Sequence, residues 1–148
     1  MFISESVALA VPLAIAQHRL LEYLLAGDMD GLASAAYQQG ASILARAGVG
    51  GLSKAVQIHS IPPYQRGSTM VLPLRWVATG ALSGAFPVLD SNLELTAADD
   101  GTEMLFVGSY RPPFGSVGAA LDRLLLHSVA QATIRSFLAQ LTEIALGN

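Results

Sequence analysis

The C-terminal segment, residues 116–146, is the feature that most constrains the fold. It contains no proline and, after Gly118, no glycine, so nothing in it interrupts a helix. A helix of about 30 residues would be roughly 45 Å long at 1.5 Å per residue, far beyond the mean of about 11–12 residues. Its apolar residues lie at helical spacing: Leu121, Leu125, Val129, Ala132, Ile134, Phe137, Leu138, Leu141 and Ile144. Such a helix needs a long apolar surface to pack against.

The residues before that helix can form such a surface. A two-residue hydrophobic period predicts strands over 55–61, 69–79, 88–97 and 103–111. The breaks between them contain turn residues, and the pair Asp100-Gly101 favours a hairpin because it tolerates positive φ. Consecutive short breaks predict an antiparallel meander. Pro73 lies inside the second stretch and can bend or split it, which leaves the strand count open by one or two.

The N-terminal third begins with a strand and continues with two short helices. Residues 2–11 alternate weakly in polarity, as in a strand. Pro12 ends that strand and suits the first turn of a helix, which runs from Leu13 to a stop at Gly27. Its apolar side is predicted to comprise Leu13, Ala16, Leu20, Leu21, Leu24 and Leu25.

A second helix follows, with Asp28 or Asp30 at its N-cap. Its apolar side is predicted to comprise Leu32, Ala35, Ala36, Ile43 and Leu44. Gly40 weakens this helix, and we expect it there because another backbone packs closely against it. The glycine-rich stretch 48–54 ends in Lys54 but has neither the spacing nor the strand-to-helix context of a phosphate-binding loop, so a hinge is favoured.

The composition excludes several classes of partner. Charged residues make up 13% of the chain, with 11 acidic against 8 basic side chains, well below the usual charged share of about 25%. No basic patch exists to neutralise nucleic-acid phosphates. The chain has no cysteine, which excludes disulfides and thiolate metal sites and suits a reducing cytoplasm. Residues 7–16 are apolar but lack the positive flank of a signal peptide, and no stretch is long enough to span a membrane.

These elements predict one α+β domain over residues 1–148, with a curved antiparallel sheet wrapped around the long C-terminal helix. The order is strand, two short helices, a run of strands and the long helix. A curled sheet closed by a helix leaves an apolar gap at one end. Ligand pockets of about 300–1,000 Å³ are mostly apolar, so the geometry suits a small hydrophobic molecule.

The order of elements, and four stretches in particular, resemble the helix-grip, or START-like, superfamily (SRPBCC, polyketide cyclase and Bet v 1-like proteins), and within it a bacterial branch. The stretches are Val71–Trp76 (VLPLRW), Phe86–Asp90 (FPVLD), Tyr110–Gly115 (YRPPFG) and Gly118–Arg123 (GAALDR). The resemblance implies binding of hydrophobic small molecules, lipids or polyketides among them, between sheet and helix. It implies no particular reaction. The predicted strand count is low against the six or seven usual in the superfamily.

Few residues offer chemistry. The three histidines, His18, His59 and His127, lie far apart with no ligand-like spacing to an acid, so neither a metal site nor a cofactor is expected. His127 follows Arg123 by one helical turn and can face the cavity, although a surface or structurally satisfied histidine is the commoner case.

Arg111 precedes Pro112 and is therefore held extended. It can form an ion pair with Asp122 at the corner between strand and helix, which we favour, or bind a ligand carboxylate in a bidentate manner. Trp76 adjoins Arg75 on a strand, so the two point to opposite faces. Burying Leu72, Leu74 and Trp76 costs less than burying Arg75 unpaired, and Trp76 is then core or pocket wall.

The last strand is apolar on both faces, with Met104, Phe106 and Tyr110 on one side and Leu105 and Val107 on the other. A strand of this kind is covered on both sides. The long helix covers one side, and either the short helices or a second subunit, which would make a homodimer, covers the other.

Three functions remain open on this scaffold. We favour a non-catalytic carrier or sensor of a hydrophobic small molecule, with no catalytic residue assigned. The predicted ligand-binding residues are Trp76, Phe106, Tyr110, Arg111, Leu121, Leu125 and His127. The second option is a small cyclase or dehydratase, which needs at least two polar groups converging on the pocket, from Tyr110, Arg111, His127 and His59. The third is an interaction module or homodimer whose cavity is filled by its own side chains.

Overall fold

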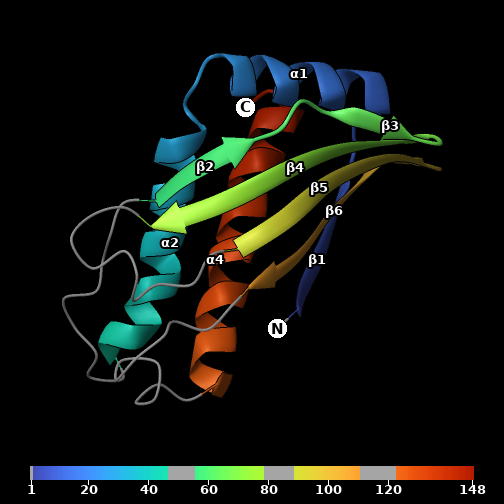
Figure 1. The fold of residues 1–148 in the computed structure, drawn as a ribbon. Helices are drawn as coiled ribbons and strands as arrows, with labels where there is room; N and C mark the ends of the chain where they lie inside the picture. The colour runs from blue at the N-terminus through green and yellow to red at the C-terminus, as the bar shows by residue number, and fades with distance from the viewer. Residues whose placement is uncertain (1, 47–55, 79–88, 111–122) are drawn as a thin grey trace.

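The computed structural model describes residues 2–46, 56–78, 89–110 and 123–148. Within them, strands and helices follow one another as the hydrophobic periods predict (Figure 1). The elements are β1 (Phe2–Leu9), α1 (Leu13–Leu25), α2 (Met29–Arg46), β2 (Val56–Ser60), β3 (Tyr64–Arg66), β4 (Thr69–Ala78), β5 (Leu89–Ala98), β6 (Gly101–Tyr110) and α4 (Arg123–Leu146). The predicted N-terminal turns of the long helix, residues 116–122, lie outside the described residues.

The strands form one antiparallel six-stranded sheet in the order β1-β6-β5-β4-β2, with β3 also paired to β4. The hairpin between β5 and β6 turns at Asp99-Asp100, as the Asp-Gly pair predicts, and the ladder closes on the pair Ala98–Gly101. In Figure 1 the sheet passes in front of α4, which runs diagonally across its inner face. This arrangement is the helix-grip fold.

β4 passes through Pro73 without a break, so the predicted bend or split does not occur. The Pro73 carbonyl accepts a hydrogen bond from the Ile61 N–H at 3.2 Å, so the backbone polar groups of Pro73 face the edge side of β4, where β2 has ended. The missing proline N–H therefore costs no hydrogen bond to β5. The sequence analysis missed β3 because it is three exposed residues without alternation, and β3 brings the count to the six strands usual in this fold.

The inner face of the sheet is the apolar one. Leu72, Leu74 and Trp76 are each no more than 4% exposed, while the Arg75 side chain between them is 60% exposed. The predicted phase of β4 is therefore confirmed. Opposite them, α4 buries Ile134, Phe137, Leu138 and Leu141. Sheet and helix thus share one continuous core.

The two short helices end and begin near the predicted positions. Gly27 terminates α1 with φ +82°, a conformation that glycine adopts without strain. Ala16 and Leu20 are buried as predicted, but Leu25 is 87% exposed because it lies in the last turn of α1. On α2, Ala35 is exposed and Ala33 is buried in its place.

α4 is fixed by polar contacts with two other elements. The Arg19 guanidinium of α1 donates to the Ala145 carbonyl at 2.8 Å, near the C-terminal end of the helix. Glu5 of β1 accepts from Gln131 Nε2 at 3.0 Å and from Arg135 Nε at 3.1 Å. Carboxylates bound by charged donors make stronger hydrogen bonds than neutral pairs.

None of the described helices is both long enough and apolar enough to cross a bilayer.

α2 packs against α4 through Gly40, as predicted for this residue. A Cβ at Gly40 would collide with Thr133 Oγ1 and would lie 2.7 Å from the Val129 carbonyl oxygen. Thr133 donates to that same carbonyl at 2.8 Å. The missing side chain therefore sets the distance between the two helices.

We expect Gly40→Ala to destabilise the fold although alanine is the better helix former, because the added methyl group must displace backbone of α4. Overpacking of this kind costs about 1–3 kcal/mol. Urea unfolding followed by circular dichroism measures the change. Gln39→Ala, at the exposed neighbouring position of α2, is the control and should stay within about 0.5 kcal/mol of wild type. A neutral or stabilising Gly40→Ala would contradict the close packing.

Candidate functional site

An aromatic cluster fills the middle of the interior. Trp76 of β4, Phe106 of β6 and Phe137 of α4 are each no more than 4% exposed. The ring centroids of Trp76 and Phe137 are 4.7 Å apart, and Phe106 lies 6.3 Å from both, all in edge-to-face geometry. Such pairs contribute about 0.5–1.5 kcal/mol beyond the burial of their area. This part of the interior is therefore packed core.

The indole N–H of Trp76 is buried and has no hydrogen-bond partner among the described residues. An unsatisfied buried donor costs about 1–3 kcal/mol. The indole contacts the Phe137 ring edge-to-face. Trp76 is thus held by shape and burial, as a core residue or as a pocket wall.

Tyr110 lies at the end of the same inner face. Strand pairing places Trp76 opposite Leu89, and Leu89 opposite Tyr110, in one row across the sheet. Tyr110 is the last residue of β6, and its hydroxyl lies 3.2 Å from His127 Nδ1 on α4. The two rings are nearly parallel, with centroids 6.4 Å apart and an interplanar angle of 27°. Sheet and helix therefore meet in a polar contact at this end.

Burial raises the pKa of the Tyr110 phenol above its ordinary value of 10. The phenol therefore stays protonated through neutral pH. It can donate to Nδ1 of a neutral His127, or accept from the Nδ1–H of the other tautomer or of the imidazolium. The pair is thus an exchangeable donor and acceptor at the edge of an apolar interior.

The predicted site residues are only partly brought together. Trp76, Phe106 and Tyr110 share the inner face of the sheet, and His127 reaches Tyr110 from α4. Leu125 belongs to α4, and its side chain is not described. Arg111 and Leu121, and with them the expected Arg111–Asp122 ion pair, lie outside the described residues. As ligand contacts, all seven remain predictions.

Sequence reasoning did not assign Phe137 to the site. It was placed on the apolar stripe of the long helix, but nothing in that spacing singles it out as the residue that contacts Trp76. The pairing depends on where α4 crosses the sheet, which the sequence does not encode locally. The only signal was that Phe137 is the one aromatic residue of α4.

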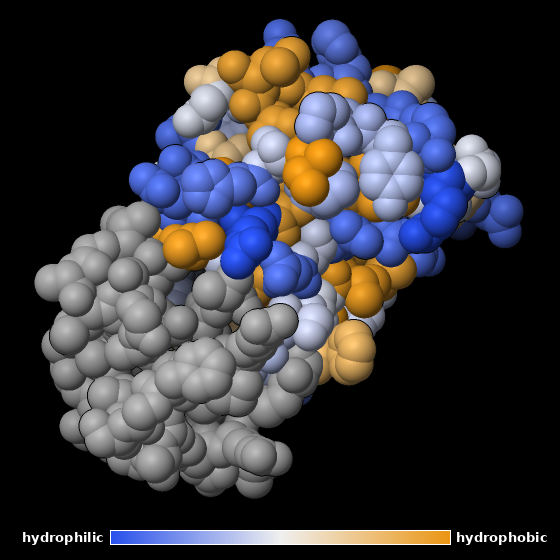
Figure 2. Space-filling view, viewed as in Figure 1, coloured by the Kyte–Doolittle hydropathy of each residue, from blue (hydrophilic) through white to orange (hydrophobic). Residues whose placement is uncertain are grey.

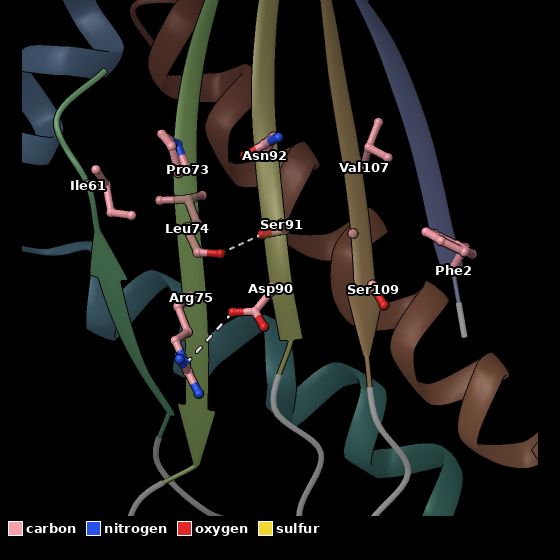
Figure 3. Close-up of a pocket in the computed structure, with 11 residues that line it drawn as sticks. Phe2, Ile61, Pro73, Leu74, Arg75, Asp90, Ser91, Asn92, Val107 and Ser109 are labelled. Carbon is pink, nitrogen blue, oxygen red and sulfur yellow. Dashed lines mark hydrogen bonds and ion pairs between the residues drawn. The ribbon is translucent and has the colours of Figure 1, made fainter. Parts of the chain in front are cut away.

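A separate hollow, of about 450 Å³, lies on the opposite, outer face of the sheet (Figure 3). Its rims carry Phe2 and Ile61, which are 79% and 63% exposed. Its floor includes the pair Arg75–Asp90, with Nε and Oδ1 3.7 Å apart. Both charged side chains are more than half exposed, so the pair contributes little to stability.

Figure 2 shows polar and apolar residues interspersed over the described part of the face seen there.

The described histidines and acids form no cluster able to hold a metal ion. His18 is an exposed side chain 3.8 Å from Glu22 on α1, and His59 is exposed on β2. Of the three histidines, His127 is the one that contacts a residue of the sheet's inner face.

Comparison with known proteins gives structural neighbours at low identity. No family model and no curated protein matches the chain. TTHA0849 from Thermus thermophilus aligns over 99% of this chain and 98% of its own, at 15% identity and TM-score 0.49. Ara h 8.0201 aligns over 100% and 99%, at 16% identity and TM-score 0.46. CV1439 from Chromobacterium violaceum aligns over 95% and 96%, at 10% identity and TM-score 0.36. The helix-grip architecture follows from this chain's own element order and strand pairing.

We expect Tyr110→Phe to remove the contact with His127 and to lower the free energy of unfolding at neutral pH by about 0.5–1.5 kcal/mol. Because burial raises the Tyr110 pKa, the neutral phenol stabilises the fold fully below pH about 10, and this contribution is lost as pH rises through the folded-state pKa. Urea unfolding at neutral pH and above pH 10 measures both effects.

The control is Tyr64→Phe, the same substitution at a tyrosine that is 49% exposed. It should change neither the neutral-pH stability nor its alkaline loss appreciably. Equal behaviour of Tyr110→Phe and Tyr64→Phe would show that the contact at the end of β6 contributes nothing.

Proposed function

We propose that the protein binds a hydrophobic small molecule, of lipid or polyketide type, between the sheet and α4. The observation that carries the proposal is the Tyr110–His127 contact: two polar side chains, one from the sheet and one from the helix, meet 3.2 Å apart at the end of an otherwise apolar interior. Pockets for small molecules typically combine an apolar lining with a few such polar groups. The resemblance found in the sequence implies the same class of ligand.

The aromatic cluster limits the part of the interior in which the ligand would lie. Trp76, Phe106 and Phe137 already fill the middle of the interior, and displacing fully buried side chains of this size would be costly. The ligand would therefore lie beyond Tyr110, against the first turns of α4, with its apolar part on the aromatic cluster and a polar atom at the Tyr110–His127 pair. Arg111, Leu121 and Leu125 belong to the same proposed site by their positions in sequence.

A small acid–base enzyme is the second candidate, and the same contact favours it. A protonated phenol and an imidazole within hydrogen-bond distance are suitable groups for moving a proton to and from a substrate. Cyclisation or dehydration of a polyketide-like substrate would be chemistry of this kind. Binding without reaction needs fewer groups and is the proposal we prefer.

The third candidate is a module whose interior is filled by its own side chains. The packing of the aromatic cluster supports it.

We propose a cytoplasmic location, because a chain without cysteine forms no disulfides and therefore suits a reducing compartment. No cofactor or metal enters the proposal.

Native mass spectrometry of the purified protein, followed by organic extraction, tests for a bound molecule. We expect a non-covalent mass increase that disappears on extraction and an apolar compound in the organic phase. For binding in solution, anilinonaphthalene sulfonate serves as a fluorescent probe of apolar sites.

We expect His127→Ala to weaken binding of this probe about tenfold, which corresponds to the loss of one good hydrogen bond or its equivalent in packing. His59→Ala, at an exposed position of β2, is the matched control. Ile61→Ser removes an apolar group from the rim of the outer hollow and should also leave the affinity unchanged. An unchanged affinity in His127→Ala would count against the proposed site, and a loss only in Ile61→Ser would move binding to the outer face.

A further inference from the structure

The two edges of the sheet differ in whether their backbone groups are protected from pairing with another chain. At the β2 edge, Ser34 of α2 bonds both backbone groups of Val56, with Oγ 3.0 Å from the nitrogen and 3.1 Å from the oxygen. Asp30 Oδ1 accepts from the Ile58 N–H at 2.7 Å. Pro62-Pro63 then interrupts the edge before the three residues of β3. Side chains and prolines of this kind are how proteins protect a sheet edge from pairing with another chain.

Within the described part of the chain, the β1 edge has no such protection. β1 pairs with β6 in unbroken register from Phe2–Ser109 to Leu9–Thr102, and residues 2–9 contain no proline, lysine or arginine. Among the described residues, no side chain or turn forms a hydrogen bond with the backbone of residues 2–9. The edge is therefore eight residues of regular strand in which alternate backbone donors and acceptors have no partner among the residues that the structure describes.

The direction of these free groups follows from one contact. The Leu9 carbonyl lies directly against Gly101 of β6, so the backbone groups of Leu9 face β6. Donors and acceptors of successive strand residues point to alternate sides. Those of Ser4, Ser6 and Ala8 therefore face the free edge.

The single charge of β1 does not block this edge. Glu5 points to the inner face, its side chain is 18% exposed, and Gln131 and Arg135 of α4 bind it there. At the end of the strand, Phe2 is 79% exposed on the outer face.

We propose that β1 pairs with β1 of a second copy of this chain, antiparallel, about a two-fold axis through Ser6. The two six-stranded sheets then form one continuous sheet. In this register Ile3 lies opposite the second copy's Leu9, and Glu5 lies opposite its Val7. Moving the axis to Glu5 would place two carboxylates opposite each other, which is destabilising. The register centred on Ser6 avoids this repulsion and pairs residues 3–9 of one copy with residues 9–3 of the other, the longest overlap that an axis through a residue facing the free edge allows.

The same register accounts for Phe2. Residues directly opposite in an antiparallel pair share a face, so Phe2 lies across from Ala10 of the second copy, a small and exposed residue. The aromatic ring then covers the second copy's chain where β1 ends. A two-fold interface repeats each contact twice, so both Phe2 side chains become covered together.

Sedimentation analysis of the full chain over a range of concentrations tests the proposal. We expect a dimer of the 15.4 kDa chain. Ser6→Pro removes an N–H that faces the free edge and leaves the β6 ladder intact, which an edge strand tolerates. Because the axis doubles the loss, we expect the dissociation constant to rise on the order of tenfold or more. A single-chain mass at every concentration, or a dimer that Ser6→Pro leaves unchanged, overturns the proposal.

Cysteine cross-linking decides the matter even if Ser6→Pro fails to fold. The chain has no cysteine of its own, so Ser6→Cys introduces one thiol per copy. Directly opposite residues of a hydrogen-bonded pair have Cα atoms about 5.5 Å apart, within the Cα range for a disulfide. We expect oxidation to a covalent dimer that is faster than for an exposed thiol elsewhere on the chain. Gln57→Cys, exposed on the protected β2 edge, is the control, and oxidation of Ser6→Cys no faster than of Gln57→Cys overturns the proposal.

Discussion

The contact between the inner face of the sheet and α4 is the interaction on which the rest of the molecule depends. α4 is 24 residues long, or about 36 Å at 1.5 Å per residue, and it buries apolar side chains along most of that length. Each fully buried side chain of this size contributes about 1.5–3 kcal/mol. α4 also contacts the two short helices, through Arg19 of α1 and Gly40 of α2.

Hydrophobic period predicted most of the fold because the sheet has one apolar face and α4 one apolar stripe. The strand boundaries of β1, β2, β4, β5 and β6 lie within two residues of those expected. The hydrophobic period does not predict β3, because β3 pairs with β4 alone and its three residues are exposed. Leu25 and Ala35 were predicted on the apolar sides of their helices but are exposed, because residue spacing gives the direction of an apolar stripe but neither its width nor where it ends.

The sequence predicts one feature of the candidate site and does not predict another. The inward phase of Trp76 was predictable because the opposite phase would have buried Arg75 without a partner. The contact between Tyr110 and His127 was not predictable, since their rings meet across two elements whose relative rotation is set by packing elsewhere. The middle of the apolar core is held without Tyr110 and His127, by Trp76, Phe106 and Phe137, and this supports the binding role proposed for the pair.

Gly40 has a consequence for descent as well as for packing. The atom nearest its absent side chain belongs to Thr133 and could change by mutation, but the next belongs to the backbone of Val129 and could not. Any side chain at this position would therefore meet the backbone of α4, whatever the protein binds. Among distant homologues too divergent to align by their strands, a glycine in the middle of the second helix would mark those that keep this spacing between helices.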